Sequence, residues 1–245
     1  MSPLPLALPG VRLHCTGWTL TGHTPAAGPL NLVQFTITND ATLAWHWAPA
    51  FRLAADAGPN GTAAPAEGWY LAGASATVTA YPSAYYHFDA WSGDTAGASA
   101  QEGPVFTAVM DAPRAVAASF APNLTAAHGV PEYWLAQYGW TGDFEAAAAA
   151  DTDGDGMPAW AEWRADTDPT DPLSRLALTA LAPEPPGGWR LVWTGGRNRT
   201  QEVQRADSPA GPWRPVHTNL PPTAATNAVT LPGGAASGFF RIAVP

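Results

Sequence analysis

The sequence predicts a mainly β, multidomain protein with small β-sheet repeats, a short helical segment and a C-terminal β-sandwich. Apolar residues alternate with polar or small residues over short segments, as in residues 86–90 and 116–120. Such alternation is typical of strands with one buried face. Pro and Gly, which number 26 and 24, separate these segments and indicate turns. A length of 245 residues allows one to three domains.

The composition allows packed cores and concentrates acidic charge in one place. Apolar residues make up 46% of the chain, and the net charge of −9 disfavours nucleic acid and anionic membranes as partners. Nine acidic residues lie between Asp143 and Asp171, with Arg164 as the only basic residue among them. Such local acidity favours cation binding over general solubility. The single cysteine, Cys15, excludes an internal disulfide.

A repeat of 73 residues organises the first half of the chain. Without any gap, Trp18 matches Trp91 at this offset, and further pairs are Pro9 and Pro82, His14 and His87, Leu43 and Val116, and Trp47 and Phe120. Two copies of one β unit follow, a truncated copy at 1–50 and a complete copy at 51–122. The part that the first copy lacks is equivalent to about 51–73 and would lie before Met1. We therefore expect a fragment of a larger protein, whose secretory leader lies upstream because none is visible here.

Four tryptophans occupy strand positions of this repeat: Trp18, Trp45, Trp47 and Trp91. We expect them to pack in cores, which is the usual place of a tryptophan in a strand, and not to stack on sugars. The truncated first copy cannot close its own sheet, so we expect it to lean on the second copy or to fray.

The complete copy resembles a known repeat family. The matching segments are Gly68-Trp69-Tyr70, Ala76-Thr77-Val78-Thr79-Ala80, Phe88-Asp89-Ala90-Trp91-Ser92-Gly93-Asp94 and the run 109–120. Together they look like the divergent internalin-type B-repeat of bacterial surface proteins. The resemblance implies a small β-sheet module that occurs in tandem arrays on extracellular proteins and has no catalytic residues.

Residues 123–172 are predicted to be helical around one acidic loop. Helices are expected at 131–139, where Pro131 suits the first turn, at 143–150, which is rich in alanine, and from Pro158 to Trp163. Between the last two helices, residues 151–162 fit the calcium-loop pattern D-x-D-x-D-G-x5-E at every fixed position. The predicted Ca²⁺ ligands are the carboxylates of Asp151, Asp153, Asp155 and Glu162 and the backbone carbonyl of Met157. Gly156 allows the sharp turn between them.

The alternative interpretation of this loop is a solvated acidic turn without metal. Residues 151–172 resemble the single calcium modules of bacterial thrombospondin type 3-like and dockerin-type proteins, but position nine is Ala159, so a water molecule must fill that place. Asp166, Asp168 and Asp171 are expected to cap turns before prolines, and the alternative is that they contact the ion or its waters.

Residues 173–245 are predicted to form a β-sandwich. Six short strands, at 176–181, 189–193, 200–205, 213–217, 228–231 and 239–244, alternate with turns rich in Pro and Gly. Glu202-Val203-Gln204-Arg205 followed by Gly211-Pro212-Trp213 resembles fibronectin type III-like modules.

The sequence predicts no enzyme and no catalytic residue, because it contains no metal-protease, nucleophile-elbow or phosphate-loop motif. We expect a calcium-stabilised structural or adhesive portion of a secreted or cell-surface bacterial protein, in which calcium stiffens the joint between the repeat and the terminal sandwich. Its partners would be the calcium ion and an extracellular glycan or protein, without insertion into a membrane. The alternative is an accessory, glycan-binding tail of an extracellular carbohydrate-active enzyme, which an exposed planar row of tryptophans on 173–245 would favour.

Overall fold

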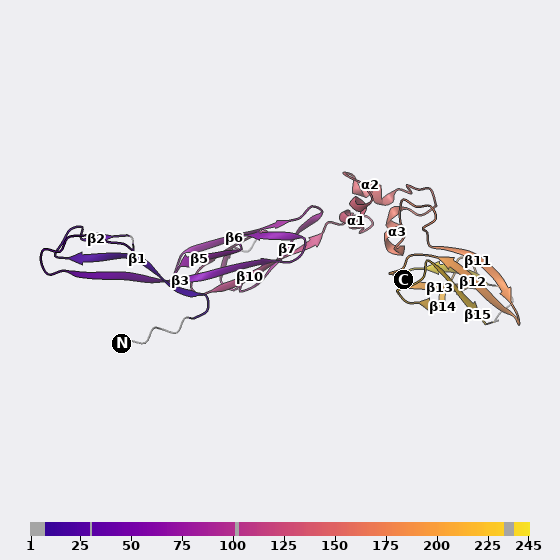
Figure 1. Ribbon diagram of the computed structural model, residues 1–245. Coiled ribbons are helices and arrows are strands. Elements are labelled where there is room, and N and C mark those ends of the chain that lie inside the picture. The colour runs from indigo at the N-terminus through magenta and orange to yellow at the C-terminus, as the bar shows by residue number, and fades with distance from the viewer. Residues whose placement is uncertain (1–7, 30, 101–102, 233–237) are drawn as a thin grey trace. The chain divides into compact units, whose positions relative to one another are not determined.

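The protein is mainly β and divides into two compact units. The computed structural model describes residues 8–245 except 30, 101–102 and 233–237, and its units are Met1–Pro122 and Asn123–Pro245 (Figure 1). The predicted fold class is therefore confirmed. The finer division into modules at 1–50, 51–122, 123–172 and 173–245 stays a prediction.

The first unit contains two sheets around one core. The strands are β1 (Val11–Thr21), β2 (Ala27–Gly28), β3 (Thr42–Ala57), β4 (Gly61–Ala64), β5 (Glu67–Leu71), β6 (Ser75–Pro82), β7 (Tyr86–Gly93), β8 (Ala98–Ala100), β9 (Val105–Val109) and β10 (Arg114–Pro122). One sheet has the order β2-β1-β3-β10-β7 with β5 also paired to β3, and the other has the order β4-β6-β9-β8. Leu53, Val78, Trp91 and Phe106 belong to the core between them. Leu53, Val78 and Phe106 lie where every second side chain faces the core, whereas Trp91 follows the register irregularity at Asp89.

The two copies of the repeat form the same strand pair. In the second copy Ala121 of β10 pairs with His87 of β7, and in the first copy Ala48 of β3 pairs with His14 of β1. Every register pair of β10 with β7 is found 73 residues earlier between β3 and β1. The irregularity in register also recurs, at Thr16 in the first copy and at Asp89 in the second. Sequence and backbone pairing thus identify the same repeat.

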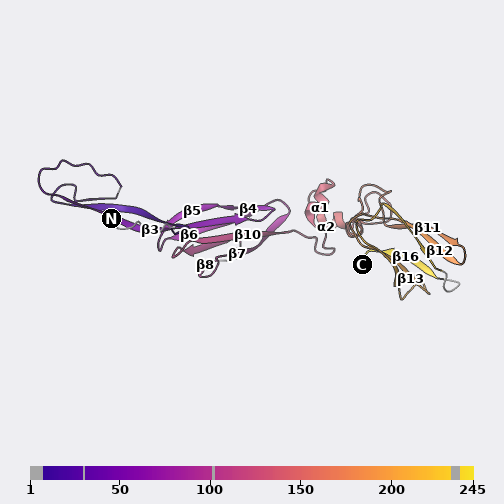
Figure 2. The ribbon, with the colours of Figure 1, turned by 60° about the horizontal axis from the view of Figure 1, so that its bottom comes forward.

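The two copies share one continuous strand. Residues 42–50 of β3 are the last strand of the first copy, and residues 51–57 are the first strand of the second copy. β1 lies beside the first part of β3 (Figures 1 and 2), and β10 pairs in parallel with residues 53–57. The expected boundary at residue 50 therefore falls inside a strand and not in a linker.

The expectation for the four tryptophans is half right. Trp18 and Trp91 are buried, with 4% and 6% of their surfaces exposed. Trp45 and Trp47 are 37% and 56% exposed, so the prediction that they pack in a core is wrong. They lie in the part of β3 that belongs to the first copy, where β1 is the one neighbouring strand among the described residues.

The second unit begins with three short helices. They are α1 (Glu132–Gln137), α2 (Phe144–Ala149) and α3 (Ala159–Ala165), all within the predicted segments or one to two residues beyond them. Asp143 caps α2 by accepting a hydrogen bond from the Ala146 N–H. Trp134, Leu135 and Ala148 form a small core that aromatic side chains surround, among them Trp160 and Trp163.

A β-sandwich completes the second unit. Its strands are β11 (Ala177–Glu184), β12 (Gly188–Thr194), β13 (Gln201–Ala206), β14 (Arg214–Asn219), β15 (Thr226–Leu231) and β16 (Phe239–Ala243). They form two sheets, β11-β12-β15 and β14-β13-β16, and β16 lies beside β13 (Figure 2). Leu191, Trp193 and Val203 share one core that draws on both sheets. Trp189, Trp193 and Trp213 are buried or half-buried, so the exposed row that would favour glycan binding is not present in this module.

Candidate metal centre

The loop between α2 and α3 brings its own two ends together. The Ala159 N–H at the start of α3 donates to the Ala150 carbonyl at the end of α2 over 2.9 Å. Gly154 and Gly156 have φ angles of +79° and +96°, a region that residues with a side chain rarely adopt. The turn that the pattern predicts at Gly156 is thus present, and it folds the chain back over the acidic side chains.

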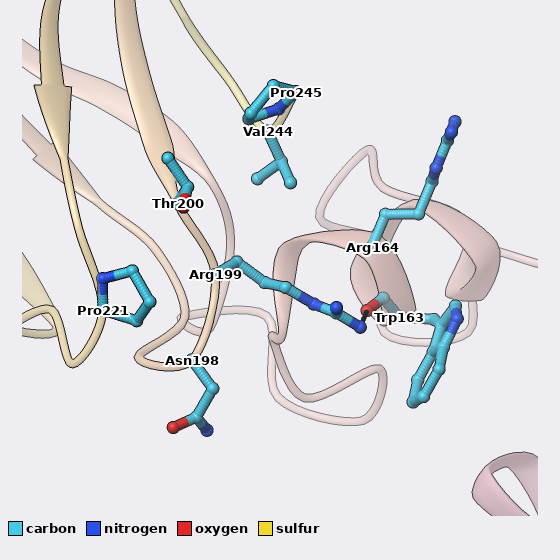
Figure 3. Close-up of a pocket in the computed structure, with 8 residues that line it drawn as sticks. All are labelled: Trp163, Arg164, Asn198, Arg199, Thr200, Pro221, Val244 and Pro245. Atoms are coloured by element: carbon cyan, nitrogen blue, oxygen red, sulfur yellow. Dashed lines mark hydrogen bonds between the residues drawn. The ribbon is translucent and has the colours of Figure 1, made fainter.

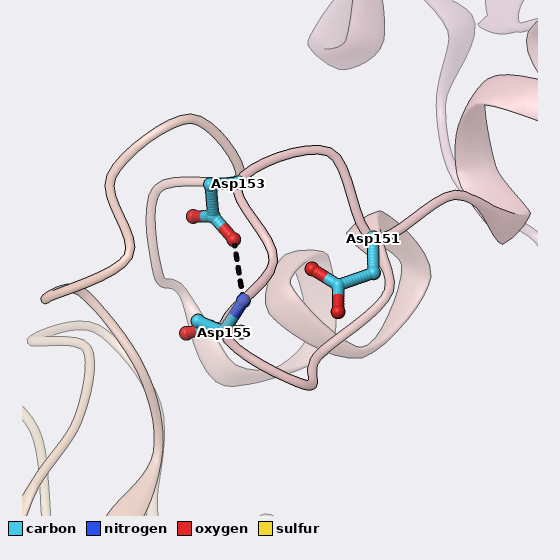
Figure 4. Close-up of side chains that lie close together, drawn as sticks. All are labelled: Asp151, Asp153 and Asp155. Atoms are coloured by element: carbon cyan, nitrogen blue, oxygen red, sulfur yellow. Dashed lines mark hydrogen bonds between the residues drawn. The ribbon is translucent and has the colours of Figure 1, made fainter.

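Three of the predicted ligands converge. Asp151, Asp153 and Asp155 each offer a carboxylate oxygen within 4.8 Å of the others (Figure 4). Backbone N–H groups of the loop fix these carboxylates: Gly154 and Gly156 donate to Asp151 over 2.9 Å each, and Asp155 donates to Asp153 over 3.2 Å. These bonds leave lone pairs on the carboxylates for a further partner.

Glu162 is presented by the first turns of α3 and is fully buried, with 0% of its surface exposed. Its Oε1 accepts a hydrogen bond from Thr167 Oγ1 over 3.4 Å, and its Oε2 accepts none from the described residues. Burial, followed by the negative charges of Asp153 and Asp155, raises the pKa of Glu162 to about 8. Glu162 therefore faces the acidic loop, although it lies outside the group of three oxygens within 4.8 Å.

The predicted role of the Met157 carbonyl stays a prediction. The Met157 N–H donates to Asp155 Oδ1 over 2.7 Å, and its sulfur accepts from the Leu176 N–H over 3.3 Å. Met157 thus links the acidic loop to the chain that enters the sandwich, a contact that the calcium pattern does not foresee.

Three buried oxygens lack a donor among the described residues: Asp153 Oδ2, Asp155 Oδ2 and Glu162 Oε2. Burial, and then the charges of Asp155 and Asp151, raise the pKa of Asp153. None of the ion pairs between described residues includes a carboxylate of this loop. Buried carboxylates without a partner are costly, and a hard cation with oxygen ligands would satisfy them. The residues present fit a calcium ion.

The later aspartates have other partners. Asp166 Oδ2 accepts from the backbone N–H groups of Arg197 and Asn198 over 3.0 and 2.9 Å. Asp168 accepts from the N–H of Thr170, and Asp171 from the N–H of Leu173. These are turn-capping bonds, as the sequence predicts for Asp168 and Asp171. For Asp166 the bonds reach the sandwich instead, a long-range contact that residue spacing cannot reveal.

A junction of polar contacts fixes the helical segment to the sandwich. Arg175 donates to the Asp155 carbonyl over 3.1 Å. Arg199 donates to the Trp163 carbonyl over 3.5 Å, as Figure 3 shows. The Arg199 guanidinium also lies 5.3 Å from the Trp163 ring. A Cβ at Gly196 would overlap the carbonyl oxygens of Ala165 and Asp166, so only glycine permits this close approach.

The side chains at this junction also line a pocket of ≈ 450 Å³ (Figure 3). Its walls include Arg164 from α3 and Thr200 and Val244 from the sandwich. Arg199 crosses toward α3, and its guanidinium is already engaged there by Trp163. We therefore regard the pocket as part of the packing between the two segments.

Part of the chain matches a known family model. Residues 51–124 match the model described as the divergent InlB B-repeat domain. This segment is similar to a B-repeat. No curated protein and no solved structure matches the chain. Domains of this family occur in surface proteins and are not catalytic. None of the described helices has the length and apolar character needed to cross a membrane.

Proposed function

We propose that residues 151–162 bind one calcium ion through Asp151, Asp153, Asp155, Glu162 and the Met157 carbonyl. The observation that carries this proposal is the burial of three loop carboxylate oxygens without a hydrogen-bond donor, Glu162 Oε2 foremost. A solvated acidic turn, the alternative, would not enclose a carboxylate at 0% exposure in this way. The agreement of the backbone turns at Gly154 and Gly156 with the calcium-loop pattern gives further support.

The expected affinity is modest and suits an extracellular setting. Position nine is Ala159, which is buried and offers no side-chain oxygen. Fewer protein ligands weaken a calcium loop, and extracellular modules typically bind with dissociation constants of about 10⁻⁴ to 10⁻³ M. An affinity in that range would leave the site filled outside the cell and empty in a cytoplasm that is poor in calcium.

The chain then acts as a non-catalytic, calcium-stabilised structural or adhesive portion of a secreted or cell-surface bacterial protein. The B-repeat match at 51–124 supports the surface location and the structural role. Calcium would stiffen the junction between the helical segment and the sandwich, because Asp155 and Met157 belong to both the loop and this junction. The accessory tail of a carbohydrate-active enzyme lacks a supporting observation, since the tryptophans of the sandwich are covered.

Isothermal titration calorimetry with calcium chloride tests the proposal. We expect one site per chain, loss of the heat in Asp153→Asn and Glu162→Gln, and little response to magnesium, which demands a tighter octahedral shell. Asp207→Asn is the matched control, because Asp207 is an aspartate of the same unit whose side chain is 86% exposed in an ion pair with Arg205. A heat that persists in Glu162→Gln, or no heat in the parent chain at 10 mM calcium, would refute it.

A further inference from the structure

The two copies of the repeat differ in how the edges of their last strands are paired. In the second copy, β10 has β7 on one edge and residues 53–57 of β3 on the other, so the strand is paired on both sides. In the first copy, residues 42–48 of β3 pair with β1 on one edge. Among the residues that the structure describes, no strand pairs with the other edge of 42–48, and β5 joins that edge only from Ala50 onward.

The side chains near this open edge are uncovered where their counterparts are buried. Ala118 of the second copy is 2% exposed, while its counterpart Trp45 is 37% exposed. Met110 is 0% exposed, while its counterpart Ile37 is 71% exposed. Apolar residues thus stand at core positions of the repeat without a core around them. An exposed strand edge with apolar side chains is a template for pairing with another strand.

We propose that the open edge at residues 41–45 binds, in parallel, the first strand of a preceding copy of the same repeat. The second copy shows how such a strand fits, because its residues 53–57 pair in parallel with residues 114–118 of β10. Shifted by 73 residues, this register places the incoming strand on residues 41–45. β5 begins its pairing at Ala50, so the two strands would follow each other along one edge without overlap.

The continuity of β3 identifies the source of the incoming strand. The strand that covers β10 is the direct continuation of the last strand of the copy before it. A copy placed one repeat earlier would supply the strand for residues 41–45 by the same rule. In each copy the first strand would then pair with the last strand of the same copy. The last strand would continue without interruption into the first strand of the next copy. This proposal deepens the structural role in the proposed function and does not depend on the calcium site.

The test adds the equivalent of residues 51–73 in front of the first copy, at the spacing of the repeat. A second copy of residues 51–73 is fused directly before Met1, which is equivalent to Ala74 in the repeat. Amide hydrogen exchange is compared between the chain as it is, the extended chain, and the extended chain with Leu53→Asp and Ala55→Asp in the added segment only. These two residues belong to the core in the native second copy.

We follow amide exchange at residues 41–45 and at residues 32–37, which are equivalent to residues 105–110 of the second copy. Exchange there should slow about tenfold or more in the extended chain, and should stay as in the parent chain when the added segment carries the two aspartates. Exchange at residues 106–110 must be the same in all three proteins, which shows that the second copy stays folded. Equal exchange in the parent and extended chains would overturn the proposal, as would equal protection by the substituted segment. Concentration-dependent dimerisation of the parent chain that protects residues 41–45 would assign the edge to a second molecule and overturn it as well.

Discussion

Replacing Glu162 by glutamine should have opposite effects on stability with and without calcium. Glutamine keeps the shape of the side chain and removes its charge. Without calcium at high pH, the parent protein must bury an ionised carboxylate that has no donor on Oε2 and faces Asp153 and Asp155. The neutral amide can donate to these carboxylates, so Glu162→Gln should be the more stable protein. With calcium, the parent gains a ligand pair that the variant lacks.

The size of both effects can be worked out. The pKa of Glu162 rises from 4.5 to about 8, and each unit corresponds to about 1.4 kcal/mol, so ionising this group above pH 8 costs on the order of a few kcal/mol. Calcium at 100 times the dissociation constant stabilises the folded state by about 2.7 kcal/mol. For a unit of about 120 residues, 1 kcal/mol shifts the midpoint by roughly 4 °C, which gives a calcium shift of about 10 °C.

Thermal unfolding at pH 9, followed by near-ultraviolet circular dichroism, measures the crossover. Glu162→Gln should melt above the parent in EDTA and below it in 20 mM calcium, while Asp207→Asn should follow the parent in both. If Glu162→Gln is destabilised equally in both conditions, Glu162 has a packing role only and the metal argument fails. If it is neutral in both, the carboxylate is not buried as described.

Three further results are expected. The raised pKa of Glu162 lets the folded, metal-free protein hold a proton that the unfolded chain releases above about pH 4.5, so metal-free stability should fall between pH 4.5 and 8. For the same reason, calcium affinity should rise by up to about tenfold per pH unit until pH 8. Calorimetry in buffers of different ionisation heat should show that close to one proton is released on calcium binding at pH 7. Gly196→Ala should destabilise the second unit by several kcal/mol in calcium or EDTA, since the overlap is with backbone oxygens; a melting curve like that of the parent would contradict the close approach. EDTA should speed amide exchange in residues 123–172 and leave Phe106 and Met110 unaffected; acceleration in the B-repeat would show that calcium acts elsewhere.

Local patterns predicted most of the secondary structure. Alternation over residues 116–120 gave β10, and the helix signals at Pro131 and Asp143 gave α1 and α2 within one to two residues. The turn at Gly156 and the convergence of three aspartates also followed from spacing alone, because a calcium loop is contiguous in sequence. Calcium occupancy and the Met157 carbonyl remain predictions.

Contacts between distant segments could not be predicted. The sequence offers no sign that Arg175 and Arg199 reach the loop and α3, since 20 and 36 residues separate them from their partners. Nor does strand alternation tell whether a second layer covers it. Trp45 and Trp47 have the pattern of core residues, and they are exposed because no described strand pairs with the other edge of residues 42–48. The periodicity of apolar residues predicts which face of a strand is apolar, whereas the burial of that face depends on the segments that pack against it.

The position of Glu162 would couple the proposed calcium binding to the folding of the second unit. α3 is only seven residues long, too short to be stable as an isolated helix, and it holds Ala159 and Ala165 in buried positions beside Glu162. To pack these alanines, the helix must also bury the Glu162 carboxylate. At neutral pH that carboxylate takes up either a proton or a cation. The proton leaves the neighbouring charges of Asp153 and Asp155 in place, whereas a divalent cation would offset two of the negative charges at once. If calcium binds as proposed, it would therefore stabilise the packed helix more than the proton does, and calcium concentration would control the order of the junction with the sandwich.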